Sequence, residues 1–153
     1  MISQRVLCFL DRDHRFLLLH RRRSPNAGMW NAIGGKIEPG EDPFAACIRE
    51  VREETGLVIS GPKLRALLVI TVRETEELWV IYVFRAPAPV GEVSASEEGD
   101  LRWVDAGEIL ALRTPADLPV ILPQILHGEE VSVVRLEYET EDSEPRRIEI
   151  LGA

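Results

Sequence analysis

Three glutamates lie close together in the first half of the chain, at positions 50, 53 and 54. Residues three and four apart share one face of an α-helix, so Glu50, Glu53 and Glu54 project together if this segment is helical. Carboxylates gathered in this way repel one another unless a cation neutralises them. Their hard oxygen atoms suit Mg²⁺ or Mn²⁺, which also bind phosphates. The glutamates therefore indicate a divalent metal site, against the alternative of a solvated acidic helix face.

Capping residues frame a helix around these glutamates. Asp42 is a good N-cap, Pro43 suits the first helical position and Gly56 stands where a C-terminal capping glycine belongs. These residues predict a helix over residues 43–55, with Glu41 in its first turn near the carboxylates. The apolar residues of the segment cluster on another side, which we expect to pack against a sheet: Phe44, Ile48, Val51 and Thr55.

The elements that must position this helix are mostly strands. Apolar, β-friendly runs predict strands at 4–10, 15–20, 64–72, 78–85 and 101–104, and a closing hairpin at 131–138 and 147–151. A short strand within 30–38 is expected to break at Gly34-Gly35, and a short helix to open at Asp105. A second helix is expected over 117–126. Strands outnumber helices without simple βαβ alternation, which predicts an α+β domain with a mixed sheet.

Length, charge and cysteine usage narrow the class of protein. The 153 residues are near the usual size of one domain, so we expect a single domain over 1–153. A net charge of −8 argues against binding to nucleic acid, and no apolar run of membrane-spanning length occurs. Cys8 and Cys47 lie in apolar stretches, as expected of buried thiols in a reducing compartment. Without a visible signal peptide, the expected location is cytoplasmic, as a monomer or homodimer.

The segment from Gly35 to Leu57 resembles the sequence box of the Nudix hydrolases. Gly35 is followed after five residues by Glu41 and, after a further seven, by Arg49. The pattern is completed by Glu50, Val51, Glu53, Glu54, Gly56 and Leu57. The resemblance implies the Nudix α/β/α sandwich with a mixed β-sheet over nearly the whole chain. It also implies that water attacks a phosphorus atom of a nucleoside diphosphate linked to another group.

The resemblance also assigns roles to residues of the box. Glu50, Glu53 and Glu54 correspond to the metal ligands of the family, with the backbone carbonyl of Gly34 or Gly35 nearby. The implied cofactor is Mg²⁺, with Mn²⁺ as the alternative.

Two further features of the catalytic site follow from the resemblance. Arg49 and Glu41 correspond to a pair that orients the site. In the loop 87–100, Glu98 holds a position from which related enzymes supply an additional metal ligand or base, and a surface acid is the alternative reading. The identity of the general base is left open, because the family places it on different loops.

Residues 28–36 resemble the corresponding segment of the MutT/MutX-type hydrolases of oxidised purine nucleoside triphosphates. In that subgroup the residue equivalent to Asn31 binds the purine base, and an amide offers both a donor and an acceptor. The alternative is that Asn31 satisfies backbone groups at a strand end. Lys36, from the same segment, is also expected to contact the substrate, and Arg21 is expected to contact its phosphates.

Asp117 matches an acidic base-recognition position of the same subgroup. The partner position is Leu118, where the human-type enzyme has an acid. The resemblance therefore does not imply that this chain discriminates an oxidised base from a normal one. Alternatively, Asp117 is the N-cap of the second helix.

Together these features predict Mg²⁺-dependent hydrolysis of a nucleoside triphosphate to a nucleoside monophosphate and pyrophosphate. The substrate is 8-oxo-dGTP or another (d)NTP. Hydrolysis of ADP-ribose or a similar nucleoside diphosphate derivative is the first alternative. The second is a non-catalytic domain that binds a nucleotide as a sensor. Sensors typically lose one of the box glutamates, whereas this chain keeps all three. The sequence leaves the preferred base and sugar and the attacked phosphorus open.

Overall fold

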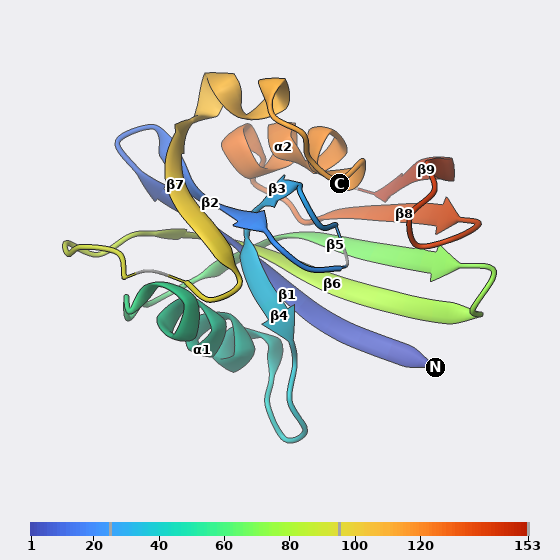
Figure 1. The fold of residues 1–153 in the computed structure, drawn as a ribbon, viewed down its shortest axis with the longest axis horizontal. Coiled ribbons are helices and arrows are strands. Elements are labelled where there is room, and N and C mark those ends of the chain that lie inside the picture. The colour runs from blue at the N-terminus through green and yellow to red at the C-terminus, as the bar shows by residue number, and fades with distance from the viewer. Residues whose placement is uncertain (25, 95, 153) are drawn as a thin grey trace.

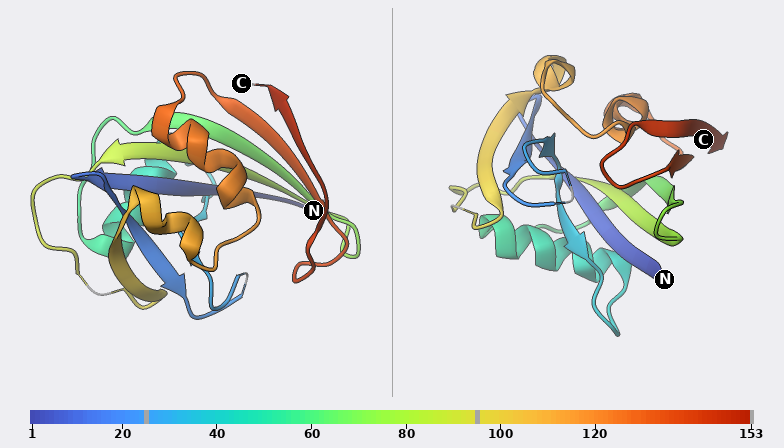
Figure 2. Two further views of the ribbon diagram at one scale, coloured as in Figure 1. Left: turned by 90° about the horizontal axis from the view of Figure 1, so that it is seen from above. Right: turned by 45° about the vertical axis from the view of Figure 1, so that its right-hand side comes forward.

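The computed structural model describes residues 1–24, 26–94 and 96–152. Pro25 and Ala95, which fall in the predicted loops 21–29 and 87–100, and the terminal Ala153 lie outside the described residues. A twisted sheet forms the middle layer, with helix α1 (Pro43–Thr55) on one face and helix α2 (Asp117–His127) on the other (Figures 1 and 2). The predicted α+β sandwich is confirmed.

The sheet is mixed, as the sequence predicts. Its strands are β1 (Ile2–Arg12), β2 (Arg15–Arg21), β3 (Trp30–Asn31), β4 (Ile33–Lys36), β5 (Lys63–Val72), β6 (Glu77–Pro87), β7 (Gly99–Asp105), β8 (Ser132–Tyr138) and β9 (Pro145–Gly152). The main order is β3-β2-β1-β6-β5-β8-β9, while β4 pairs with β1 and β7 with β2. The pairs β1–β6 and β5–β8 are parallel and the others are antiparallel. A 3-10 helix, η1 (Ala106–Ala111), follows β7 as predicted.

Helix α1 has the predicted bounds and caps. The Asp42 carboxylate accepts a hydrogen bond from the amide of Ala45 at 2.8 Å. At the other end, Gly56 adopts φ 81° and donates its amide to the Arg52 carbonyl. A left-handed conformation of this kind is accessible to glycine at little cost, which explains why the helix stops there.

The buried face of α1 differs in part from the predicted one. Val51 and Thr55 are fully buried, as expected, together with Ala46 and Cys47. Ile48 is partly buried against the same core, but Phe44, in the first turn, is 48% exposed. Its ring still meets an aromatic ring of β6 edge-on.

The glycines at positions 34 and 35 do not break the strand that contains them. β4 runs through both, and the interruption falls at Ala32 instead. The predicted break is wrong because β4 pairs closely with β1: a Cβ at Gly34 would overlap the backbone carbonyl of Val6. Glycine is therefore required here for close backbone approach rather than for a turn.

Each face of the sheet has its own apolar core. Alternate residues of β1 divide between them, with Phe9 in the core under α2 and Cys8 in the core under α1. Cys8 and Cys47 are both free and buried, as predicted. A hydrogen bond to Cys47, together with burial, raises the pKa of Cys8 well above its ordinary value.

Helix α2 contradicts one alternative reading of Asp117. Ala116 occupies the N-cap position, without a side-chain capping bond, and Asp117 is the first helical residue. Asp117 is therefore not an N-cap. Among the helices of the described residues, none is both long and apolar enough to cross a membrane.

Candidate functional site

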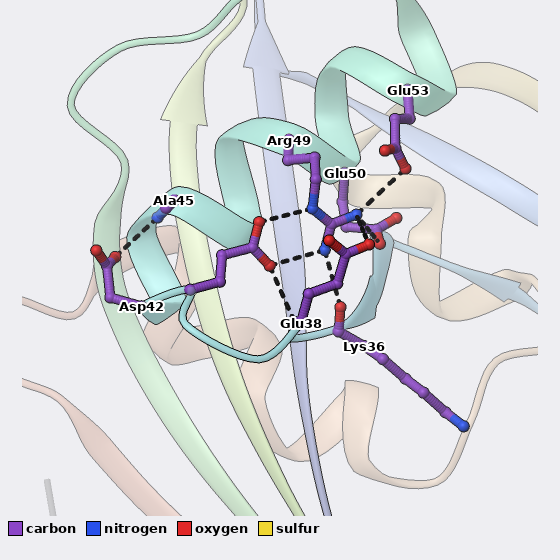
Figure 3. A network of polar contacts seen from close by, with 8 residues as sticks. Lys36, Glu38, Asp42, Ala45, Arg49, Glu50 and Glu53 are labelled. Carbon is purple, nitrogen blue, oxygen red and sulfur yellow. Dashed lines mark hydrogen bonds and ion pairs between the residues drawn. The ribbon is translucent and has the colours of Figure 1, made fainter.

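Arg49 is the centre of a network that joins α1 to the end of β4 (Figure 3). Its guanidinium donates two hydrogen bonds to the carboxylate of Glu41, at 2.7 and 2.9 Å. It also donates to the Lys36 carbonyl at 2.9 Å, to Glu50 Oε1 at 2.8 Å and to Glu53 Oε2 at 3.2 Å. The predicted pairing of Arg49 with Glu41 is thus present, and the same arginine orients two of the box glutamates.

Glu41 lies before the helix rather than in its first turn. It precedes the N-cap residue Asp42, and its Oε1 accepts the amide of Glu38 at 3.0 Å. The hydrogen bonds from Arg49, and then the one from Glu38, lower the pKa of Glu41 to about 2. Glu41 is therefore ionised at neutral pH, and it holds Arg49 beside the other carboxylates.

Gly35 makes room for Glu50. A Cβ at Gly35 would overlap the carboxylate of Glu50, so no other residue type leaves this carboxylate its present position against β4. The side chain of Glu50 is only 12% exposed, whereas that of Glu53 is 56% exposed. Burial, and then the charges of Glu53 and Glu54, raise the pKa of Glu50 despite the bond from the neighbouring arginine.

A serine connects Glu54 to the loop before β7. The hydroxyl of Ser96 donates to the Glu54 carboxylate, and the amide of Glu98 donates to Ser96 Oγ at 3.1 Å. Burial raises the pKa of Glu54, and the charges of Glu98 and Glu53 raise it further. The structure therefore brings Glu98 close to the helix carboxylates. Ser96 was not among the residues predicted from the sequence, although a serine two residues before an acid is a common local capping arrangement.

The carboxylates have the chemistry of a divalent cation site. Within residues 1–24, 26–94 and 96–152, no group of three acidic, histidine or cysteine side chains converges on a point where an ion fits without rearrangement. The reason is visible: Arg49 holds oxygens of Glu50 and Glu53. Mg²⁺ normally keeps several waters and uses only one or two carboxylates beside substrate phosphates. The oxygen-only donors of Glu50, Glu53 and Glu54 fit such a cation.

A pocket opens on the other side of β4, on the face of the sheet that α2 covers. Arg21, Asn31 and Asp117, all predicted substrate contacts, line it together with Gly34 and Gly35. Other residues of the lining were not predicted from the sequence, because they come from distant strands and from the turn after β8: Arg5, Trp79, Tyr138 and Glu141. The pocket therefore extends from Asp117 to the glycine against which the carboxylate of Glu50 lies.

Two buried polar residues lie within this pocket. Asn31 is 8% exposed, and its Oδ1 accepts the amide of Ala32 at 2.8 Å, so it does satisfy a backbone group. Asp117 is 6% exposed, and burial raises its pKa to about 6. Leu118 is fully buried in the core under α2.

Two of the three predicted or newly found cationic residues near the site, Arg5 and Arg21, line the pocket, whereas Lys36 does not. Arg21 lines the pocket, and its charge acts on the carboxylate of Glu54, where it partly opposes the rise in pKa, and on Arg5, whose pKa it helps to lower. The Arg5 guanidinium lies 4.2 Å from the centre of the Trp79 ring. Lys36 contributes its carbonyl to the network, while its side chain is exposed and extends away from Arg49 (Figure 3).

The amino-acid sequence is similar to those of known proteins. A NUDIX domain model matches residues 1–125. The uncharacterized Nudix hydrolase YvcI of Bacillus subtilis (strain 168) is 40% identical over 111 residues, 69% of this chain and 68% of the relative. An oxidized purine nucleoside triphosphate hydrolase of Danio rerio is 36% identical over 105 residues, 68% of this chain and 67% of the relative. The CTP pyrophosphohydrolase of Escherichia coli (strain K12) is 31% identical over 119 residues, 76% of this chain and 86% of the relative.

Comparison of the structure with solved structures identifies the same group of proteins. The crystal structure of a MutT protein from Bacillus halodurans superposes with a TM-score of 0.85, covering 97% of each chain at 27% identity. The family match covers the network around Arg49 and most of the pocket. The chain therefore belongs to the Nudix family, as a hydrolase that resembles the MutT proteins.

Proposed function

We propose that residues 1–153 act as one Nudix domain that hydrolyses a nucleoside triphosphate to a nucleoside monophosphate and pyrophosphate with Mg²⁺. One observation carries this proposal: the pocket that contains Asn31 and Asp117 reaches Gly35, behind which the Glu50 carboxylate lies. A nucleotide whose base enters this pocket therefore has its phosphates directed toward the acidic face of α1.

The residues of the pocket suit a nucleotide. Trp79 and Tyr138 offer aromatic surface to a base, and Asn31 and Asp117 offer polar groups to its edge. Arg21 lines the pocket, and its charge reaches the Glu54 carboxylate, so a phosphate near α1 is a suitable partner for its guanidinium.

The box residues have separable roles in the proposed reaction. Glu50, Glu53 and Glu54 would hold the cation, with Glu98 as an additional ligand or base. The cation would neutralise phosphate charge and lower the pKa of a water. The water attacks phosphorus, the bond to the bridging oxygen breaks, and pyrophosphate leaves. The proton that the water loses passes to a carboxylate of this cluster. Arg49, held by Glu41, keeps the cluster in place.

Two alternatives use the same site. Hydrolysis of ADP-ribose or a related compound requires only a different group in the pocket. A non-catalytic sensor binds nucleotide without turnover, and the retention of all three box glutamates argues against it. The relatives act on different bases, as their names state, so the base preference is for direct measurement.

The deciding experiment is a nucleotide panel with Mg²⁺ in ¹⁸O-labelled water. The panel includes 8-oxo-dGTP, dCTP, CTP and ADP-ribose, and the products are separated by anion exchange and identified by mass spectrometry. We expect a nucleoside monophosphate and pyrophosphate, and the labelled product shows which phosphorus is attacked. Orthophosphate as the first product would overturn the proposed cleavage. Binding of nucleotide without any turnover would favour the sensor.

A further inference from the structure

A second pocket lies at the opposite end of the sheet from the proposed nucleotide site. It is lined by the last residues of β1 and β6, the first residues of β5 and the C-terminal end of α2. The nucleotide pocket is lined by the other ends of the same three strands. The two pockets therefore share the face of the sheet that α2 covers, without sharing a lining residue.

Arg65 is the unusual residue of this second pocket. It is located at a register shift between β5 and β6, and bulges of this kind redirect a side chain. Only 9% of Arg65 is exposed, and its Nη1 donates to the Glu129 carbonyl at 3.3 Å. Its Nε and Nη2 are buried and have no hydrogen-bond partner among the described residues. A buried guanidinium with unused donors is unfavourable unless a ligand supplies acceptors.

Other cations surround Arg65. Lys63 and Arg85 are directly opposite each other in the β5–β6 ladder, so their side chains share a face. The Arg85 guanidinium already donates hydrogen bonds to the Asp11 carboxylate, at 2.9 Å, and to the carbonyl of Ile125, at 2.7 Å. No hydrogen bond or ion pair of the Lys63 side chain is present within the part of the chain that the structure describes. The lining thus has three cationic side chains and a single carboxylate, in a chain of net charge −8.

We propose that this pocket binds a small oxyanion of the phosphate type. A tetrahedral oxyanion has several acceptor oxygen atoms, which can accept hydrogen bonds from the unused donors of Arg65 and Lys63 at the same time. Its negative charge also offsets the positive charges of these side chains. Water in the same place would accept hydrogen bonds but would leave the positive charge uncompensated. The proposal is independent of the proposed hydrolysis, because the site shares no residue with the carboxylate network.

The test is a titration of ¹⁵N-labelled protein with inorganic phosphate, followed by the amide signals of residues in each pocket. Chelator is present, so that no metal–phosphate complex forms at α1, and chloride keeps the ionic strength constant. Gly61 and Gly128 line the second pocket, whereas Gly34 and Gly35 line the first. We expect saturable shifts at Gly61 and Gly128.

Substitutions then assign the binding to the cations. Arg65→Gln should weaken phosphate binding by about tenfold or more, since charged hydrogen bonds are lost. Lys63 is exposed, so Lys63→Gln should fold normally and still weaken binding several-fold, even if Arg65→Gln does not fold. Arg147→Gln removes an equal charge from an exposed position of β9 and should leave the affinity unchanged. Shifts that grow without saturation would mean that the pocket holds water only. Equal affinity in Lys63→Gln and the wild type would show that phosphate binds elsewhere, and would overturn the proposal as well.

Discussion

Arg49 and Glu41 determine how the acidic residues of α1 are arranged before a cation binds. Two hydrogen bonds between them make the pair rigid, and the same guanidinium reaches Glu50 and Glu53. A planar guanidinium with several donors is able to hold three carboxylates at once, which a lysine ammonium does less specifically. The repulsion among the glutamates is therefore partly offset within the protein itself.

Among single residues, substitution of Glu53 tests the proposed metal site most directly. Glu53→Gln should lower kcat by about 10²-fold or more, because a charged ligand that stabilises the transition state is lost. Its side chain is 56% exposed, so the fold and the thermal stability of the metal-free protein should remain level or rise slightly. Steady-state kinetics at saturating Mg²⁺ measure kcat, and thermal melts of the metal-free protein measure its stability. Glu74→Gln, in the exposed turn before β6, is the matched control, and near wild-type turnover in Glu53→Gln would rule out the assignment.

Asp117 gives a prediction about pH. Burial raises its pKa from 3.8 to about 6 in the folded protein, so the folded state keeps this proton longer than the unfolded chain. The free energy of unfolding contributed by this group is therefore present below pH 4 and is lost as the pH rises to about 6. Asp117→Asn should be as stable as the wild type near pH 4 and up to about 3 kcal/mol more stable at pH 7.5. Urea denaturation at several pH values measures the difference, which should not stay constant across this range.

Strand β4 is the element that connects the two halves of the site. One of its faces lies against the helix carboxylates and the other opens into the proposed nucleotide pocket. Its glycines permit two different close approaches, Gly34 to the backbone of β1 and Gly35 to the side chain of Glu50. A methyl group would therefore disturb the strand pairing at Gly34 but the Glu50 side chain at Gly35.

Alanine substitutions should separate stability from activity along this strand. Gly34→Ala forces β4 away from the Val6 carbonyl and should cost about 2–3 kcal/mol, lowering Tm by about 5–10 °C. Gly35→Ala displaces only the end of the Glu50 side chain, so it should lower kcat/KM by about tenfold or more with a smaller change in Tm. Melts and kinetics on the two variants provide the comparison. A larger loss of Tm in Gly35→Ala than in Gly34→Ala would contradict this account of the strand.

On the scale of the whole molecule, the net charge of −8 is unevenly distributed. Acidic groups gather on α1 and the loop before β7, while cationic groups line the second pocket and part of the first. The sheet separates the helix carboxylates from the core under α2. A cation that binds the carboxylates therefore stabilises the fold without rearranging the core.

Mg²⁺ should raise the thermal stability of the intact protein. At ten times its dissociation constant, a ligand specific for the folded state adds about 1.4 kcal/mol, which corresponds to about 3–5 °C for a chain of this size. Melts with MgCl₂ and with NaCl at equal ionic strength measure the specific effect. The gain should be smaller in Glu53→Gln, and an equal gain with NaCl would show only general screening.

The sequence determined the helix 43–55, its caps, the carboxylate face and the Nudix identity, because each depends on residues within a few positions of one another. The tertiary structure decided the rest of the site. Alternation along a strand tells which face a residue occupies but not which strand lies beside it. The parallel pairing of β1 with β6 brings Arg5 to Trp79, and pairing of β5 with β8 brings in Tyr138. Since no local pattern specifies these neighbours, the composition of both pockets emerges only when the sheet is assembled.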